Sequence, residues 1–89
     1  MQADKEKVGL ILRTARGQID GILKMIDDDR YCIDISNQIV AVQAQLRKAN
    51  KEVLGAHMKC CVKDAMQEDE SKAEEKIEEL IGLIDNLMK

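Results

Sequence analysis

The residues of this sequence that could carry chemistry are one histidine and three cysteines. His57 and Cys61 are four positions apart. On a helix this spacing places both side chains on one face, a turn apart, where they can bind the same metal ion. The side chain of Cys60 points about 100° away from that of Cys61 around the helix axis, so we do not expect Cys60 to bind that ion. An isolated histidine and a buried cysteine are also compatible with a purely structural role, so spacing alone leaves both interpretations open.

Cys32 lies 25 positions before His57, in what the sequence pattern predicts to be the same helix. At 1.5 Å per residue the two residues are ~37 Å apart, so they cannot meet within one chain. Two such helices packed antiparallel would bring Cys32 of one chain to His57 and Cys61 of the other, with two equivalent sites per dimer. Two thiolates and one imidazole are soft donors that suit three-coordinate Cu(I), whereas zinc would need a fourth ligand.

Apolar residues at steps of three and four predict the three helices that position these residues. The first is expected from residue 4 to residue 25 or 27. The second, over about 30–65, spans ~50 Å, which is too long to fold back on itself in so short a chain. The third is expected over about 71–87, where Ser71 followed by Glu74 fits a capping box. We predict an all-α fold whose long second helix pairs antiparallel with a second copy in a four-helix-bundle-like core.

Composition predicts one small domain over residues 1–89 that shares its core with other copies. Of the 89 residues 45% are hydrophobic, but only 1% are aromatic, so a lone chain has little apolar area to bury. No apolar run approaches the ~20 residues of a membrane span. Residues 1–7 are polar, unlike a signal peptide, so we expect a cytoplasmic protein whose cysteines are thiols.

The net charge of −3 argues against a generic nucleic-acid binder, but the charge is unevenly distributed. Residues 31–63 carry five basic side chains against two acidic ones, and residues 64–89 carry three against nine. This segregation leaves room for a basic face away from an acidic third helix. A single histidine, the lack of a glycine-rich phosphate loop and the small volume argue against an enzyme.

Five segments of the sequence together point to one family. They are RTARGQIDGI at 13–22, YCIDI at 31–35, QIVAVQ at 38–43, HMKCCV at 57–62 and IEEL at 77–80. Over nearly its whole length the chain resembles the copper-sensing operon repressor (CsoR) family of bacterial DNA-binding repressors. The Cys…His-x-x-x-Cys arrangement is similar to that of the copper-sensing branch. Persulfide sensors of this family lack the histidine, and its nickel or cobalt sensors carry extra nitrogen ligands.

The resemblance implies roles for particular residues. The implied Cu(I) ligands are Cys32, His57 and Cys61. Tyr31 and Glu79 would couple the bound metal to DNA release, and a carboxylate on the distal nitrogen of a ligating histidine is a common arrangement. Glu78 is the alternative to Glu79.

The resemblance further implies a dimer of dimers that binds operator DNA without a helix-turn-helix. The candidates for phosphate or groove contacts are Arg13, Arg16, Arg47 and Lys48. We therefore predict a homotetrameric repressor that binds DNA without metal and is released by Cu(I). One alternative is a thiol or persulfide sensor of the same fold that uses Cys32 and Cys61, with Cys60 as a spare thiol. The other is a helical assembly module that does not bind DNA.

Overall fold

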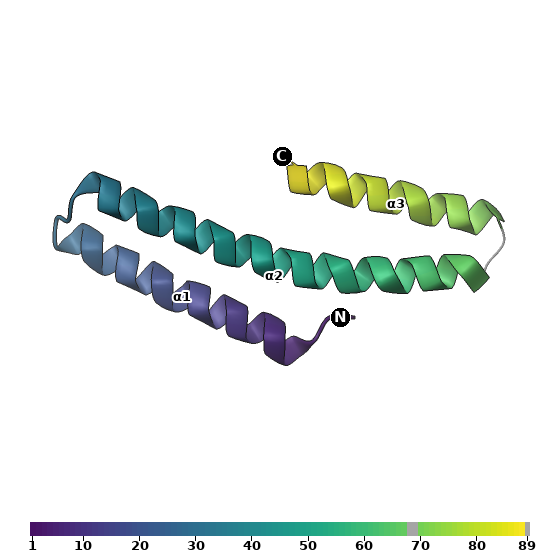
Figure 1. Ribbon diagram of the computed structural model, residues 1–89, viewed down its shortest axis with the longest axis horizontal. Helices are drawn as coiled ribbons and strands as arrows, with labels where there is room; N and C mark the ends of the chain where they lie inside the picture. Colours follow the sequence, from purple (N-terminus) through teal and green to yellow (C-terminus); the bar gives the residue numbers. More distant parts are fainter. Residues whose placement is uncertain (68–69, 89) are drawn as a thin grey trace.

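Three helices form the protein, and the all-α prediction is confirmed. The structure is a computed structural model that describes residues 1–67 and 70–88. Helix α1 covers Lys5–Asp27, α2 covers Cys32–Gln67 and α3 covers Glu70–Met88. Figure 1 shows α1 and α3 on opposite sides of α2, with α1 beside its first half and α3 beside its second half. Within the described residues no helix combines the length and the apolar character that a membrane span requires.

Helix α1 begins where its sequence provides a cap. The Asp4 carboxylate accepts hydrogen bonds from the backbone N–H groups of Glu6, at 2.9 Å, and Lys7, at 3.3 Å. These are two of the N–H groups that have no partner within the helix, so the cap stabilises its first turn. The buried residues of α1 recur at steps of three, four and seven and form one stripe that faces α2: Val8, Ile11, Ala15 and Ile22.

The connection between α1 and α2 is a Schellman turn. The N–H of Arg30 bonds to the carbonyl of Met25 and the N–H of Asp29 to the carbonyl of Ile26, at 3.0 and 3.1 Å. Asp29 between them has a φ of 52°, the left-handed conformation that this turn requires. Because the turn takes up residues 28–31, α2 begins at Cys32, two residues later than the sequence pattern predicts.

Replacing Asp29 with glycine is expected to stabilise the protein. Glycine adopts a positive φ without the steric cost that a β-carbon adds. We expect the free energy of unfolding to rise by up to ~1 kcal/mol, and thermal unfolding followed by circular dichroism measures the change. Asp28→Gly is the matched control: its φ of −87° is ordinary, so there glycine adds only backbone entropy to the unfolded chain. An equal shift in both variants would contradict the prediction.

Helix α2 is one uninterrupted rod of 36 residues, about 54 Å long at 1.5 Å per residue. Gly55 lies inside it and does not break it. The rod determines the shape of the chain, which measures 59 × 27 × 12 Å with a radius of gyration of 17.9 Å. A compact domain of this length would have a radius near 12 Å. The protomer is therefore an open, elongated layer of helices.

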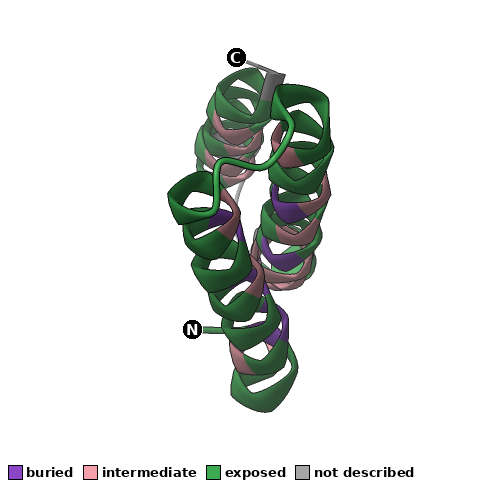
Figure 2. Ribbon diagram, turned by 90° about the vertical axis from the view of Figure 1, so that its left-hand side faces the viewer, coloured by how far each residue is buried: buried purple, intermediate pink, exposed green. Residues whose placement is uncertain are grey.

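The interior of the protomer is thin. Its central cluster consists of Ala15 and Ile22 of α1 and Val42 of α2, with Ile35 packed against it. Figure 2 shows the buried residues as a few short patches on ribbons that are otherwise exposed or intermediate. Large apolar side chains that include Ile39, Leu46 and Ile81 are about half exposed. Exposed apolar surface of this kind is typical of a chain that buries it against another chain.

The start of α3 differs from the sequence-based expectation. The helix includes Glu70, so Ser71 already lies inside it and is not the N-cap. The predicted start is thus one residue late, and the side chain of Ser71, on which the capping-box prediction depends, lies outside the described residues. The position before Glu70 lies outside the described residues.

Candidate metal centre

Helices α2 and α3 bring together three side chains with three different donor atoms. His57 and Cys61 are one turn apart on α2, and Cys61 Sγ lies 3.3 Å from His57 Nε2. Glu79 reaches across from α3, and its Oε1 lies 3.1 Å from the same Nε2. All three donor atoms lie within 4.8 Å of one another. The group is therefore compact enough to hold one metal ion.

The three side chains differ in their access to solvent. Cys61 is 4% exposed, so its thiol is enclosed between α2 and α3. The side chains of His57 and Glu79 are 41% and 46% exposed. Both line an open cavity of about 490 Å³ whose other walls include Val53, Leu54 and Leu83. An ion can thus approach from the side of the imidazole and the carboxylate, while the sulfur binds from the interior.

The imidazole of His57 uses one nitrogen for both neighbours. Nε2 faces the Cys61 thiol and the Glu79 carboxylate, so in this arrangement the carboxylate is not on the nitrogen distal to the thiol. A carboxylate accepts a hydrogen bond only from a protonated nitrogen, and a metal ion binds only an unprotonated one. An ion on Nε2 would therefore compete with the Glu79 hydrogen bond, whereas an ion on Nδ1 would leave it in place.

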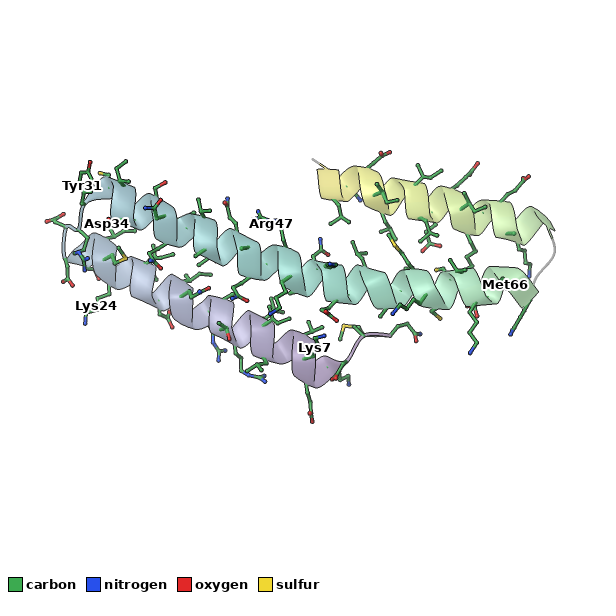
Figure 3. The ribbon with its side chains drawn as sticks, in the orientation of Figure 1. Lys7, Lys24, Tyr31, Asp34, Arg47 and Met66 are labelled. Atoms are coloured by element: carbon green, nitrogen blue, oxygen red, sulfur yellow. The ribbon has the colours of Figure 1, made fainter. Side chains whose placement is uncertain are left out.

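Cys32 and Tyr31 lie far from this group within one protomer. Cys32 is the first residue of α2 and is exposed, and 25 helical residues, ~37 Å, separate it from His57. Figure 3 shows Tyr31 at the same end of the rod, beside the turn from α1. One chain thus brings together His57 and Cys61 but neither Cys32 nor Tyr31. This is the separation that the uninterrupted second helix predicts.

The four candidate DNA contacts are all exposed, but they do not form one patch on the protomer. Arg13 is about 160° round α1 from the buried Ile11 and Ala15, so it lies on the outer side of α1. Arg47 is about 140–160° round α2 from the buried Val42 and Ala49. Figure 3 shows Arg47 on the side of α2 that faces away from α1.

Arg16 belongs with Arg13 on α1, and Lys48 with Arg47 on α2. A single surface containing all four would have to combine side chains of different protomers. Cys60, which the sequence pattern places away from His57 and Cys61, has its thiol 3.9 Å from the Asp64 carboxylate instead.

The three-helix fold and the group of three potential metal ligands between α2 and α3 are features of a small helical metal-binding protein. Residues 4–86 match the family described as metal-sensitive transcriptional repressor, and the chain belongs to this family. The resemblance noted in the sequence is thereby confirmed at the level of the family.

Named relatives and solved structures of the family are similar to this chain. The copper-sensing transcriptional repressor CsoR of Mycobacterium ulcerans is 39% identical over 82 residues, which make up 91% of this chain and 68% of that protein. The chain spans 60% of the length of the Mycobacterium tuberculosis CsoR.

Among solved structures, CsoR with Cu(I) from Geobacillus thermodenitrificans has a TM-score of 0.81 at 38% identity, covering 96% of this chain and 86% of that one. The nickel-responsive regulator InrS has a TM-score of 0.84 at 27% identity, covering 97% and 94%.

Proposed function

We propose that the protein is a Cu(I)-responsive transcriptional repressor that works as a symmetric oligomer, with residues 1–89 as its single metal-sensing and DNA-binding domain. The observation that carries the proposal is the His57–Cys61 pair at 3.3 Å, on a rod that presents Cys32 on the same face. The names of its relatives, which sense copper, support the choice of ion. The proposed setting is the cytoplasm, where operator DNA is the partner.

The helical geometry of α2 supports a site shared between two chains. At 100° per residue, 25 residues place His57 within about 20° of Cys32 around the helix axis, and 29 residues place Cys61 within about 20° on the other side. Ile39 and Leu46 continue the same face and are about half exposed. Two rods packed antiparallel along this face would bury that apolar seam and bring Cys32 of one chain to His57 and Cys61 of the other.

The donor set favours Cu(I) over the other inducers of related proteins. Two thiolates and one imidazole are soft ligands, and Cu(I) accepts three of them without a fourth. Ni²⁺ prefers nitrogen-rich sites, and this chain has a single histidine. A persulfide or disulfide sensor would need only the thiols, yet here the imidazole lies 3.3 Å from the Cys61 sulfur, which indicates a site built around nitrogen and sulfur together.

Tyr31 and Glu79 are proposed to connect the site to DNA binding. Glu79 joins α3 to α2 through His57, and Tyr31 lies next to Cys32 where the partner chain would meet the site. Binding of metal to Nε2, the nitrogen that faces Cys61, would displace the hydrogen bond to the Glu79 carboxylate, so metal occupancy would change the contact between α2 and α3. A ligand shifts an equilibrium only through such a difference in contacts between two states.

X-ray absorption of the copper-loaded protein together with a DNA gel shift tests the proposal. We expect two sulfur atoms and one nitrogen around copper, and loss of the DNA complex when one Cu(I) per chain is added. Two results would contradict the proposal: copper coordinated by nitrogen and oxygen atoms, or a DNA complex that persists after one Cu(I) per chain has been added.

The basic residues of α1 and α2 are expected to contribute to DNA affinity through phosphate contacts. Arg13→Ala and Arg16→Ala should each reduce the slope of log affinity against log salt by about one. Fluorescence anisotropy with operator DNA at several salt concentrations measures the slope. Lys76→Ala, on the acidic third helix, serves as the charge-matched control and should leave the slope unchanged. A control that lowers the slope as much as Arg13→Ala would contradict the assignment.

A further inference from the structure

A row of basic side chains on α2 leads into a hollow outside the metal centre. We propose that Lys51, Gly55 and Lys59 form a seat for the sugar–phosphate backbone of DNA, beside the N-terminal segment. None of these three residues is a metal ligand or one of the four DNA contacts that the sequence suggested. The inference rests on the proposed function in that DNA is the partner, and it names a place on the protomer where that DNA binds.

The row is a single ridge of α2. Its members Arg47, Lys51, Gly55 and Lys59 follow one another at steps of four residues. Each step advances about 6 Å along the helix and turns only about 40° around it, so the four positions are neighbours on the surface. The three basic side chains are exposed. From Lys51 to Lys59 the ridge spans ~12 Å, about the length of three to four phosphates of one DNA strand.

A hollow of about 380 Å³ interrupts the ridge at Gly55. It is lined by Gly55 and the small Ala56, by the two lysines on either side, and by residues 2–4 before α1. A β-carbon on Gly55 would meet no atom within 4 Å, so packing within the protomer does not require a glycine here. Glycine inside a helix is destabilising relative to alanine, but it allows close approach of another backbone. We therefore assign the hollow to a bound molecule.

The charges around the hollow favour an anion. Two acidic residues also line it, but both are engaged: the Asp4 carboxylate caps α1, and Glu52 forms an ion pair with Lys7 at 3.1 Å. Within residues 1–67 and 70–88, neither Lys51 nor Lys59 forms an ion pair. The hollow thus presents two cations that are not compensated, and a phosphodiester supplies the opposite charge.

DNA binding by the full chain tests the two lysines. The probes are a fluorescein-labelled duplex from the region upstream of its own gene and a mixed-sequence duplex of the same length at low salt. Lys51→Ala and Lys59→Ala should each lower the slope of log affinity against log salt by about one. The loss should be equal on both duplexes, because phosphate contacts carry no sequence information. Lys76→Ala on α3 removes the same charge and should leave the slope unchanged.

Filling the hollow tests the glycine without changing the charge. Leucine is a better helix former than glycine, so Gly55→Leu should raise the Tm measured by circular dichroism. Its DNA affinity should nevertheless fall about tenfold or more, the loss that corresponds to one charge-assisted contact. Gly82→Leu on α3 is the matched control, since a β-carbon there also meets no atom within 4 Å. It should raise the Tm and keep the DNA affinity.

Two results would overturn the seat: wild-type salt slopes in both lysine variants, or equal DNA affinity in Gly55→Leu and Gly82→Leu. If either occurs while the wild type binds DNA and releases it on addition of Cu(I), the seat is wrong and the proposed function stands. If the variants lose affinity as expected but the wild type ignores Cu(I), the seat stands and the copper response is wrong. A wild type that binds neither duplex overturns both.

Discussion

Replacing Cys32 with alanine is expected to abolish stoichiometric tight binding of Cu(I) and, with it, copper-driven release of DNA. In the proposed dimer the variant removes one of three donors, leaving Cys61 and His57, which are 3.3 Å apart on the other chain. Removing even an outer partner of a metal ligand commonly costs 10- to 100-fold in affinity, so loss of a thiolate should cost more than about 100-fold. Anaerobic competition with a Cu(I) chelator measures the affinity.

The matched control is Cys60→Ala, which also removes one thiol. The Cys60 sulfur lies 3.9 Å from the Asp64 carboxylate, and its side chain leaves the helix about 100° from that of Cys61. We expect Cys60→Ala to bind Cu(I) and release DNA like the wild type. Because Cys32 is exposed at the first position of α2, its replacement should leave the fold unchanged, which circular dichroism can verify. Unchanged copper binding in Cys32→Ala would disprove the shared site.

Replacing Glu79 with glutamine is expected to separate copper binding from regulation. The carboxylate lies 3.1 Å from His57 Nε2. Through this contact, metal binding to the imidazole can affect the position of α3. Glutamine keeps the shape of the side chain but weakens the hydrogen bond by removing its charge. Allosteric coupling between two sites typically corresponds to a 5- to 150-fold change in affinity, and in Glu79→Gln we expect that factor to approach one. Cu(I) should still bind stoichiometrically, with an affinity lowered by at most the 10- to 100-fold that loss of an outer partner of a metal ligand typically costs.

DNA affinity measured with and without Cu(I) gives the coupling factor directly. Glu78→Gln is the control, since this exposed neighbour points about 100° away from Glu79 around α3. It removes the same charge from the same helix and should retain full coupling. A Glu79→Gln protein that still releases DNA on copper addition as the wild type does would exclude the carboxylate from the coupling.

Much of the fold follows from local sequence patterns. The apolar stripe of α1, the Asp4 cap and the polar residues 27–30 place the first helix and its end almost correctly, because these signals act within a few residues. The start of α2 shifts by two residues because it depends on the backbone hydrogen bonds of the turn at Asp29. Helix α3 begins one residue earlier than predicted. Composition also pointed to a thin interior, since the chain has no Phe or Trp and a single Tyr.

By itself the sequence determined the helical state, the one-turn spacing of His57 and Cys61, and the distance that keeps Cys32 away from them. All three depend only on the fixed rise and rotation of an α-helix. Only the tertiary structure decided that α3 folds back along α2 so that Glu79 meets His57 at the nitrogen that also faces Cys61. Likewise, only the packing of α1 against α2 placed Arg13 and Arg47 on opposite outer sides of the pair. These relations depend on how helices pack across a turn, which local spacing does not encode.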